Sequence, residues 1–391
     1  MAWRNGYDLS SFLLFEASGD SEGDCNSPGD SELHIQNLFA MYYGISLARE
    51  DDAESCSLDS SETLGSHEAN DCDYDEDFDH DDHTNDSHQM MGLSEAALAF
   101  VPRKEGEEES KVVVDRRKEK IMDEIERNRL FWETCFEGCD ASVLLNSTTN
   151  NKAEKDAIPN LSLAGFDVIE EIKTQLEKTC PGIVSCADIV ALSARDSVSF
   201  QFNKSIWQVL TGRRDGNISR ASEALANIPS PFSNFTTLKQ DFANKKLTVL
   251  DLVVLSGAHT IGVGHCNTFS NRLYNFTGKG DADPSLNSTY AATLKTKCTS
   301  LSDNTTVVEM DPGSSLTFDS HYFTILKLRE GLFQSDAALL TDNRSSNIVD
   351  EILSSGKFFK KFSHSIKKMG AIGVLTGTSG EIRKKCNVIN S

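Results

Sequence analysis

The residues from Arg127 to Leu145 could carry out acid–base chemistry. This stretch reads RNRLFWETCFEGCDASVLL and places Arg129 and Glu133 beside a pair of cysteines. A carboxylate such as Glu133 could shuttle a proton if burial raised its pKa toward neutrality, and an arginine could stabilise a developing negative charge. The same residues also continue a charged run from upstream, so the alternative interpretation is a solvated helix without a site.

Apolar residues recur with helical spacing beyond Gly138. In FDVIEEIKTQLEK the apolar stripe consists of Val168, Ile169, Ile172 and Leu176. Two further helices begin with the spacing of a capping box, Ser185 with Asp188 and Thr248 with Asp251. The second of these helices runs to LSGAHTIG, where small residues permit close approach of another group. No strand-like alternation of consequence is present, so the sequence predicts an all-α fold.

The charge of the chain is acidic and unevenly distributed. Among 391 residues, 38 Lys and Arg face 60 Asp and Glu, which gives a formal net charge of -22. This balance argues against nucleic acid or an anionic membrane as the main partner. Runs such as EANDCDYDEDFDHDDH repel themselves and offer no apolar spacing to bury. We therefore predict a disordered acidic region over residues 1–110 and a charged amphipathic helix at the junction, residues 111–137.

Targeting signals and cysteine usage give opposite indications. The apolar run FLLF near the start has neither a basic region before it nor a cleavage site after it, so no signal peptide is predicted. No stretch reaches the roughly 18 apolar residues of a membrane span. Seven of the ten cysteines, however, lie from Cys135 onward without the spacing of a zinc site, which indicates a disulfide framework. N-x-[ST] sequons concentrate in the same part, which favours a secretory origin for that part alone.

Residues 138–391 resemble the class III secretory plant haem peroxidases over nearly the whole segment. The motifs that carry the resemblance occur in order and are GCDASVLL, EKDAIPN, CPGIVSCADIVALSARD, GRRDG, LSGAHTIGVGHC, FDSHYF and LFQSDAALLTD. Each motif alone is modest, but the ordered set is highly specific. The resemblance implies the haem peroxidase helical fold, here N-terminally incomplete, with haem b as cofactor. It also implies a monomer that oxidises small phenolic donors with hydrogen peroxide in an extracellular location.

The resemblance assigns His259 as the proximal haem ligand and Asp336 as its hydrogen-bond partner. One imidazole nitrogen can bind iron while the other donates to a carboxylate, which pushes electron density toward the metal. From the residues alone, His259 would be a helix-end histidine with satisfied hydrogen bonds, and Asp336 an N-cap for the ALL segment.

Calcium on each side of the haem is also implied, because calcium takes six to eight hard oxygen ligands from turns. The proximal set is complete and consists of Thr260, Asp311, Ser314, Thr317 and Asp319. The distal set retains Gly138, Asp140, Ser142 and the supporting acid Glu154. The distal set is damaged, since Thr134 replaces the family's aspartate and the loop CFEGC is one residue shorter. We expect calcium at the proximal site and weak or no calcium at the distal site.

The distal catalytic residues also depart from the family. The family's helix reads R-L-H-F-H-D-C, in which the second histidine moves the proton and the arginine stabilises charge. Arg129 falls in register here, but Glu133 occupies the histidine position. Asn160, which matches the residue that hydrogen-bonds that histidine, is retained. Pro229 in IPSPF matches the proline that lines donor access, although a plain spacer is the alternative.

Three disulfide bridges are implied by the resemblance. They are Cys186–Cys386, Cys266–Cys298 and, in a tighter ring than in the family, Cys135–Cys139. The family's partner for Cys180 is missing, and Cys25, Cys56 and Cys72 lie in acidic, Ser-rich sequence. We therefore expect Cys180 to be unpaired, with the loss of a bridge worth about 2 to 4 kcal/mol.

These observations favour a haem peroxidase domain over residues 138–391 whose catalysis is impaired by loss of the distal histidine. A rival from another class is a non-catalytic intracellular interaction protein, or a fusion of two gene products, that carries a peroxidase remnant. A transcript that spans the junction near Glu137 would discriminate between a real chain and a fusion. A third hypothesis is a haem protein that holds iron but turns over slowly.

Overall fold

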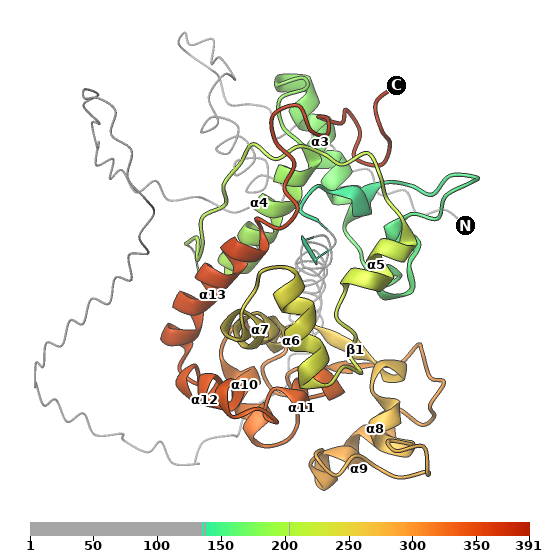
Figure 1. Cartoon of the computed structure of the whole chain (residues 1–391), viewed down its shortest axis with the longest axis vertical. Coiled ribbons are helices and arrows are strands. Elements are labelled where there is room, and N and C mark those ends of the chain that lie inside the picture. Colours follow the sequence, from blue (N-terminus) through green and yellow to red (C-terminus); the bar gives the residue numbers. More distant parts are fainter. Residues whose placement is uncertain (1–134, 137, 203) are drawn as a thin grey trace, which may run out of the picture. The chain divides into compact units, whose positions relative to one another are not determined.

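The structure, a computed structural model, describes residues 135, 136, 138–202 and 204–391, which belong to one unit of the chain. This part is predominantly helical, as the sequence predicts, with a single antiparallel sheet of two short strands among the described residues (Figure 1). The predictions for residues 1–110, and for nearly all of 111–137, lie outside the described residues. None of the described helices is both long and apolar enough to cross a membrane.

Helix α3 (Phe166–Thr179) forms from the predicted stripe, and all four stripe residues are buried. Lys173 is buried with them, although its sequence position gave no sign of this. Its ammonium group donates to Glu177 Oε1 at 2.6 Å and to the Val184 carbonyl at 2.5 Å. The ion pair satisfies a charge that would otherwise be costly to bury, and it fixes the loop that leads from α3 to α4.

Helix α4 (Cys186–Ser199) is buried on nearly all sides, as its apolar sequence predicts. Ser185 caps the helix by accepting a hydrogen bond from Asp188 N. The Asp188 carboxylate does not complete a capping box, because it accepts instead from Gly212 N at 2.7 Å and pairs with Arg213. The Ser185 hydrogen bond of the predicted capping box is therefore present, whereas the Asp188 side chain makes a tertiary contact instead.

Helix α7 (Val249–Ser256) leads directly into the short turn η6 (Gly257–Thr260). The complete capping box predicted for this helix is present, since Thr248 accepts from Asp251 N and the Asp251 carboxylate accepts from Thr248 N at 2.8 Å. At the other end of α7, a Cβ atom on Gly257 would lie 2.5 Å from the Phe358 ring. The glycine thus permits the close approach that the sequence predicts.

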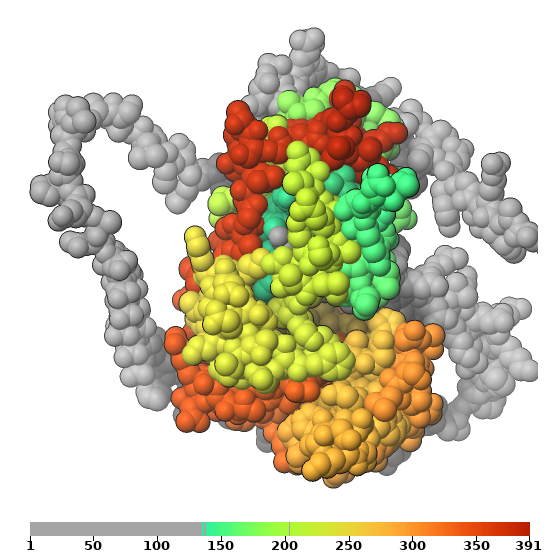
Figure 2. Space-filling model, turned by 45° about the vertical axis from the view of Figure 1, so that its right-hand side comes forward, coloured from blue at the N-terminus to red at the C-terminus, as the bar shows by residue number. Residues whose placement is uncertain are grey.

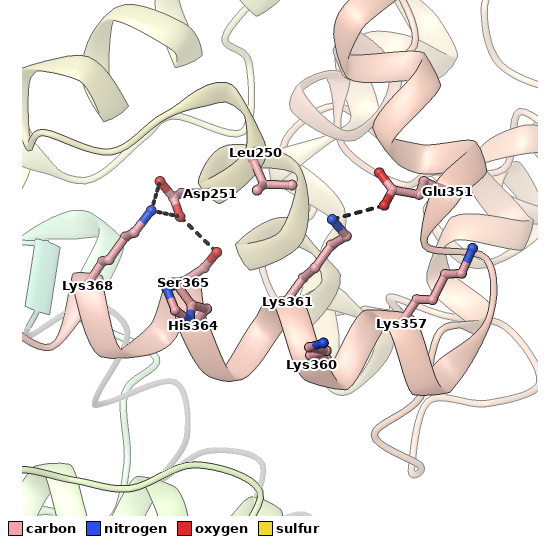
Figure 3. Close-up of a pocket in the computed structure, with 9 residues that line it drawn as sticks. All are labelled: Leu250, Asp251, Glu351, Lys357, Lys360, Lys361, His364, Ser365 and Lys368. Carbon is pink, nitrogen blue, oxygen red and sulfur yellow. Dashed lines mark hydrogen bonds and ion pairs between the residues drawn. The ribbon is translucent and has the colours of Figure 1, made fainter. Parts of the chain in front are cut away.

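Asp251 also joins α7 to helix α13 (Ser355–Met369). The buried carboxylate accepts from Ser365 Oγ at 2.8 Å and pairs with Lys368 Nζ at 3.3 Å (Figure 3). Burial by itself would raise the pKa of Asp251, but hydrogen bonds from Thr248 and Ser365 and the charge of Lys368 hold it below its ordinary value. One carboxylate therefore fixes both the start of α7 and its position on α13.

The other helices of the described residues complete the main core and a smaller second one. The α-helices are α5 (Ala221–Asn227), α6 (Phe235–Asn244), α8 (Ser270–Tyr274), α9 (Ser288–Lys297), α10 (His321–Lys327), α11 (Gln334–Ala338) and α12 (Asn343–Glu351). The 3-10 turns are η2 (Ser142–Leu144), η3 (Glu154–Asp156), η4 (Ile158–Asn160), η5 (Phe200–Phe202), η6 and η7 (Cys266–Thr268). Helices α6, α12 and α13 pack on α7, which lies in the main core.

The second core forms around α8 and α9. Strand β1 (Val263–His265) pairs with β2 (Val307–Glu309) beside it, a small sheet that the sequence did not predict. The bridge between Cys266 and Cys298 lies inside this core. On the surface in Figure 2, the segment near residues 270–300 occupies one end of the face and the last residues of the chain occupy the other.

The disulfides agree with the expectation except at Cys180. All three implied bridges are present. Cys180 is also disulfide-bonded, with a partner outside the described residues. The expectation of an unpaired Cys180 is therefore wrong, because the composition around a cysteine does not determine which thiols meet in space.

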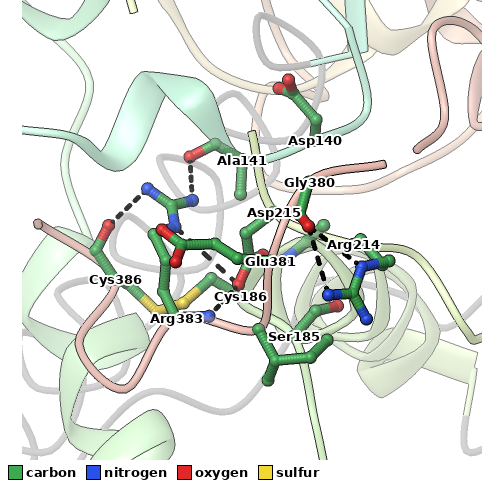
Figure 4. A network of polar contacts seen from close by, with 12 residues as sticks. Asp140, Ala141, Ser185, Cys186, Arg214, Asp215, Gly380, Glu381, Arg383 and Cys386 are labelled. Carbon is green, nitrogen blue, oxygen red and sulfur yellow. Dashed lines mark hydrogen bonds and ion pairs between the residues drawn. A yellow bond between two sulfur atoms is a disulfide. The ribbon is translucent and has the colours of Figure 1, made fainter. Parts of the chain in front are cut away.

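A buried arginine ties the C-terminal segment to the rest of the main core. Arg383 is fully buried and donates to the Cys386 carbonyl at 2.8 Å and to the Ala141 carbonyl at 2.6 Å (Figure 4). Its backbone N–H donates to the Asp215 carboxylate, which also accepts from Ala187 N at the start of α4. Three segments far apart in the sequence are thus held together by charge-assisted hydrogen bonds.

We predict that Asp251→Asn lowers the free energy of unfolding by about 1 to 2 kcal/mol, because it weakens a helix cap and a buried ion pair. Since the folded-state pKa lies below the unfolded value, the carboxylate stabilises the fold above roughly pH 4. This contribution is lost as the pH falls through the folded-state value. Denaturant unfolding of parent and variant between pH 7 and pH 3 measures the difference, which should shrink in acid.

Asp350→Asn is the matched control, because Asp350 forms an exposed ion pair with Lys327. It should change stability little at any pH. A difference between parent and Asp251→Asn that stays constant down to pH 3 would contradict the assigned role of the charge.

Candidate functional site

The structure places His259 in the turn η6 with its ring nitrogen Nδ1 directed at Asp336 in α11. Its Nδ1 lies 2.8 Å from Asp336 Oδ1. The His259 side chain is 37% exposed, whereas that of Asp336 is 1% exposed. The Nε2 atom has no hydrogen-bond partner among the described residues, so one ring nitrogen is engaged by a buried carboxylate and the other is not.

Both oxygens of Asp336 accept hydrogen bonds. Oδ1 accepts from His259 and also from the Tyr322 hydroxyl at 2.8 Å, while Oδ2 accepts from Phe333 N at 2.7 Å. Burial alone would raise the pKa of Asp336, but the His259 imidazole and these hydrogen bonds hold it below its ordinary value. The carboxylate is therefore charged in its buried position.

Asp336 lies inside α11, whose N-cap is Phe333, so it is not the N-cap that the local sequence suggests. Through Oδ2 it accepts from the N-cap backbone at Phe333 N and so supports the first turn of α11. Through Oδ1 it accepts from His259, which is the contact that the family resemblance implies. A carboxylate can do both because its two oxygens face different groups.

The turn that precedes Asp336 is fixed from the second core. The buried guanidinium of Arg272 donates from Nη1 to the carbonyls of Gly331, Leu332 and Phe333, at 2.6, 2.8 and 2.9 Å. Asp283 balances its charge through a contact of 2.7 Å to Nε. Arg272 was not predictable from the sequence, since an arginine that binds distant carbonyls leaves no local pattern.

The ring of His259 is held between aromatic edges. The Tyr322 ring lies 5.8 Å away at 85° and the Phe333 ring 5.5 Å away at 89°, measured between centroids and ring planes. Both contacts are edge-to-face, which aromatic rings prefer. Ring orientation is therefore set by packing as well as by the hydrogen bond to Asp336.

These residues fit the haem that the resemblance implies. A histidine that ligates a metal usually donates its other ring N–H to a carboxylate, and His259 has this arrangement. The half-exposed ring with an uncommitted Nε2 leaves an atom able to bind iron. His259 and Asp336 therefore have the chemistry that a proximal pair requires.

The implied proximal calcium residues converge next to His259. Thr260 Oγ1 lies 3.0 Å from Asp311 Oδ2, 3.1 Å from Asp319 Oδ1 and 3.5 Å from the Thr317 carbonyl oxygen. Ser314 Oγ donates to Asp319 Oδ2 at 2.6 Å. All five predicted side chains or carbonyls thus contribute oxygen atoms to one small cluster.

This oxygen cluster suits a hard cation. Asp311 is fully buried, and burial raises its pKa despite hydrogen bonds from His321 and Thr260. A carboxylate that is costly to charge gains from a nearby cation. In the part of the chain that the structure describes, no three His, Cys, Asp or Glu side chains converge as in a zinc centre. Hydroxyls, a carbonyl and two carboxylates are the donors that calcium takes.

The distal set also comes together, but its oxygens are engaged with one another. Asp140 Oδ1 accepts from Ser142 N at 3.0 Å, and Ser142 Oγ donates to Glu154 Oε2 at 2.8 Å. Gly138 accepts from Asp140 N through its carbonyl. A side chain at Gly216 would collide with the Asp140 carboxylate, so this glycine permits the packing.

The remaining predicted residues are placed only in part. Asn160 is buried and donates from Nδ2 to the Glu154 carbonyl at 3.0 Å, which orients its amide. Arg129 and Glu133 lie outside the described residues. Pro229 is half-buried, and two residues later the Pro231 carbonyl accepts from Ser335 N, which ties this loop to α11.

The chain is similar in sequence to known peroxidases. The sequence matches the family described as Peroxidase over residues 110–355, a span that begins upstream of Gly138. It is 57% identical to Peroxidase 3 of Arabidopsis thaliana over 267 residues, which cover 67% of this chain and 81% of that protein. It is also 54% identical to Peroxidase 39 and 56% identical to Peroxidase 27 of the same plant, over 82% and 81% of those proteins.

We predict that the purified protein binds closer to one calcium ion than two per chain. The proximal set is complete, whereas the distal set has lost a ligand position and a loop residue. Metal analysis after mild chelation measures the stoichiometry. Asp311→Asn should abolish the retained ion, and Asp140→Asn should leave it in place; two tightly held ions in the parent would show that other ligands repair the distal loop.

Proposed function

The chain belongs to the peroxidase family, and on that premise we propose that it binds haem b through His259 and reduces hydrogen peroxide with small phenolic donors. The observation that carries this proposal is the contact between Nδ1 of His259 and the buried, charged Asp336 at 2.8 Å. This contact fixes the tautomer that leaves Nε2 able to bind iron.

The bound haem would supply the redox centre that passes electrons from the phenolic donors to the peroxide. Asp336 would accept the Nδ1 proton of His259 in a hydrogen bond and increase the basicity of the imidazole. The aromatic contacts from Tyr322 and Phe333 would keep the ring from rotating. The oxygen cluster at Thr260, adjacent in sequence, would hold calcium and anchor the turn that carries His259.

On the distal side we propose that catalysis is impaired. The hydrogen bond from Asn160 Nδ2 to the Glu154 carbonyl orients the Asn160 amide, which would in turn orient a distal residue. The residue that would move the proton is Glu133, and the residue that would stabilise charge is Arg129. Glu133 is a weaker candidate than a histidine, because its carboxyl is ionised near neutral pH unless burial raises its pKa.

We also propose a path for the phenolic donor and a cellular location, both on the basis of the family. The loop at Pro229 would line the donor path, and a monomer outside the cell is the state that the family implies. Exposed sequons at Asn146, Asn217 and Asn275 are open to glycosylation. The sequon at Asn160 is not, because its amide is 1% exposed and hydrogen-bonded.

We predict that His259→Ala abolishes stoichiometric haem binding. The alanine variant has no imidazole to ligate iron, so the Soret band of the reconstituted protein should be lost or shifted strongly. His364→Ala is the control, because His364 is exposed on α13. A normal Soret band and unchanged haem content in His259→Ala would refute the assignment of His259 as the ligand, whereas a parent chain that binds no haem would favour the non-catalytic rival.

We predict that the haem-loaded chain reacts with hydrogen peroxide at least about a hundredfold more slowly than a relative with a distal histidine. Positioned acid–base catalysis contributes a factor of roughly 100 to 10,000. Stopped-flow mixing with peroxide measures the rate, and a guaiacol assay measures turnover. Glu133→Gln keeps the shape and removes the titrating group, so it should react at the same slow rate. Fast reaction in the parent and a large loss in the variant would instead identify Glu133 as a working base.

A further inference from the structure

A tyrosine shares the carboxylate oxygen that His259 uses. The Tyr322 hydroxyl donates to Asp336 Oδ1 at 2.8 Å, the same distance at which His259 Nδ1 meets that atom. Asp336 Oδ2 is engaged separately by Phe333 N. One carboxylate oxygen therefore accepts hydrogen bonds from two side-chain donors.

The Tyr322 hydroxyl is fixed as a donor. Its side chain is 0% exposed, so no bulk water competes for the hydrogen bond. An ordinary tyrosine hydroxyl keeps its proton at neutral pH, and a carboxylate oxygen can only accept, so Tyr322 donates to Asp336. Helix α10 (His321–Lys327) holds the ring in the main core beside Phe323.

Asp336 does not need Tyr322 in order to stay in position. Its Oδ2 is anchored by the backbone of Phe333, and that turn is held by three hydrogen bonds from Arg272. The carboxylate would therefore remain in place without the tyrosine hydroxyl. The Tyr322 hydroxyl instead reduces the negative charge on Oδ1 that is available to the other donor, His259.

We propose that Tyr322 is a positioning residue that moderates the hydrogen bond between Asp336 and His259, and so sets how strongly His259 donates electrons to bound haem iron. A carboxylate oxygen that accepts a second hydrogen bond is a weaker acceptor for the first. Hydrogen bonds to the outer nitrogen of a metal-binding histidine tune the metal's reduction potential. The inference rests on the proposed haem function of His259.

Tyr322→Phe tests the proposal because it removes the hydroxyl and keeps the ring that packs on His259. With Oδ1 left to His259 alone, the His259 hydrogen bond strengthens. The ferric–ferrous midpoint potential of the reconstituted protein should then shift to a more negative value. The iron–histidine stretching frequency of the ferrous protein, measured by resonance Raman spectroscopy, should shift upward.

Tyr274→Phe is the matched control, since the Tyr274 hydroxyl donates to the Cys298 carbonyl in the second core. It should leave both readings unchanged. Circular dichroism confirms that each variant is folded. An unchanged or more positive potential in folded Tyr322→Phe would overturn the proposal, because it would mean that the hydroxyl has no effect or serves only to hold Asp336.

A second substitution covers the case in which Tyr322→Phe does not fold. Site-specific replacement of Tyr322 by 3-fluorotyrosine keeps the hydrogen bond and makes the hydroxyl a stronger donor. The potential should then shift in the opposite direction, to a more positive value, and no shift would overturn the proposal. Failure of the parent to bind haem through His259, seen first in the Soret band, would overturn the proposed function and this inference together.

Discussion

The hydrogen bond between His259 and Asp336 is the contact on which the organisation of the described residues depends. Its two residues lie 77 positions apart, so each must be brought to the contact by separate packing. Asp251 fixes α7, and with it His259, against α13. Arg272 fixes the turn before Asp336 from the second core. The two cores are therefore coupled through one buried charge, and the small sheet and the oxygen cluster around Thr260 lie next to this junction.

Sequence patterns predicted the elements that depend on local physics. The stripe of α3 and the capping box of α7 follow from spacing alone, because periodicity and caps involve residues within a few positions of each other. The family motifs added His259, Asp336 and the oxygen cluster. Arg272, Tyr322 and Arg383 were not predictable, since each is defined by carbonyls or carboxylates far away in the chain. Cys180 was interpreted wrongly for the same reason.

Asp336 shows how one carboxylate can serve a local and a distant contact. A local rule explained it as the N-cap of the ALL segment, and a family motif explained it as the partner of a histidine. In the structure Phe333 is the N-cap of α11, and Asp336, three residues later, accepts from Phe333 N through one oxygen and from His259 through the other. Asp188 follows the same logic, because its place in a cap sequence does not prevent its carboxylate from binding Gly212 and Arg213. Polar residues at helix starts can serve local and distant contacts together.

The buried Arg383 has a consequence for the order in which the chain can fold during synthesis. Its guanidinium and backbone bind Ala141, Asp215 and Cys386, so these contacts cannot form until the chain up to Cys386 has left the ribosome. Until then Asp215 and the carbonyl of Ala141 lack this partner, and the nascent chain exposes surface that the finished fold buries. Helices such as α3 and α4 can form earlier, but the contacts that join them to the C-terminal segment form only after that segment has been synthesised.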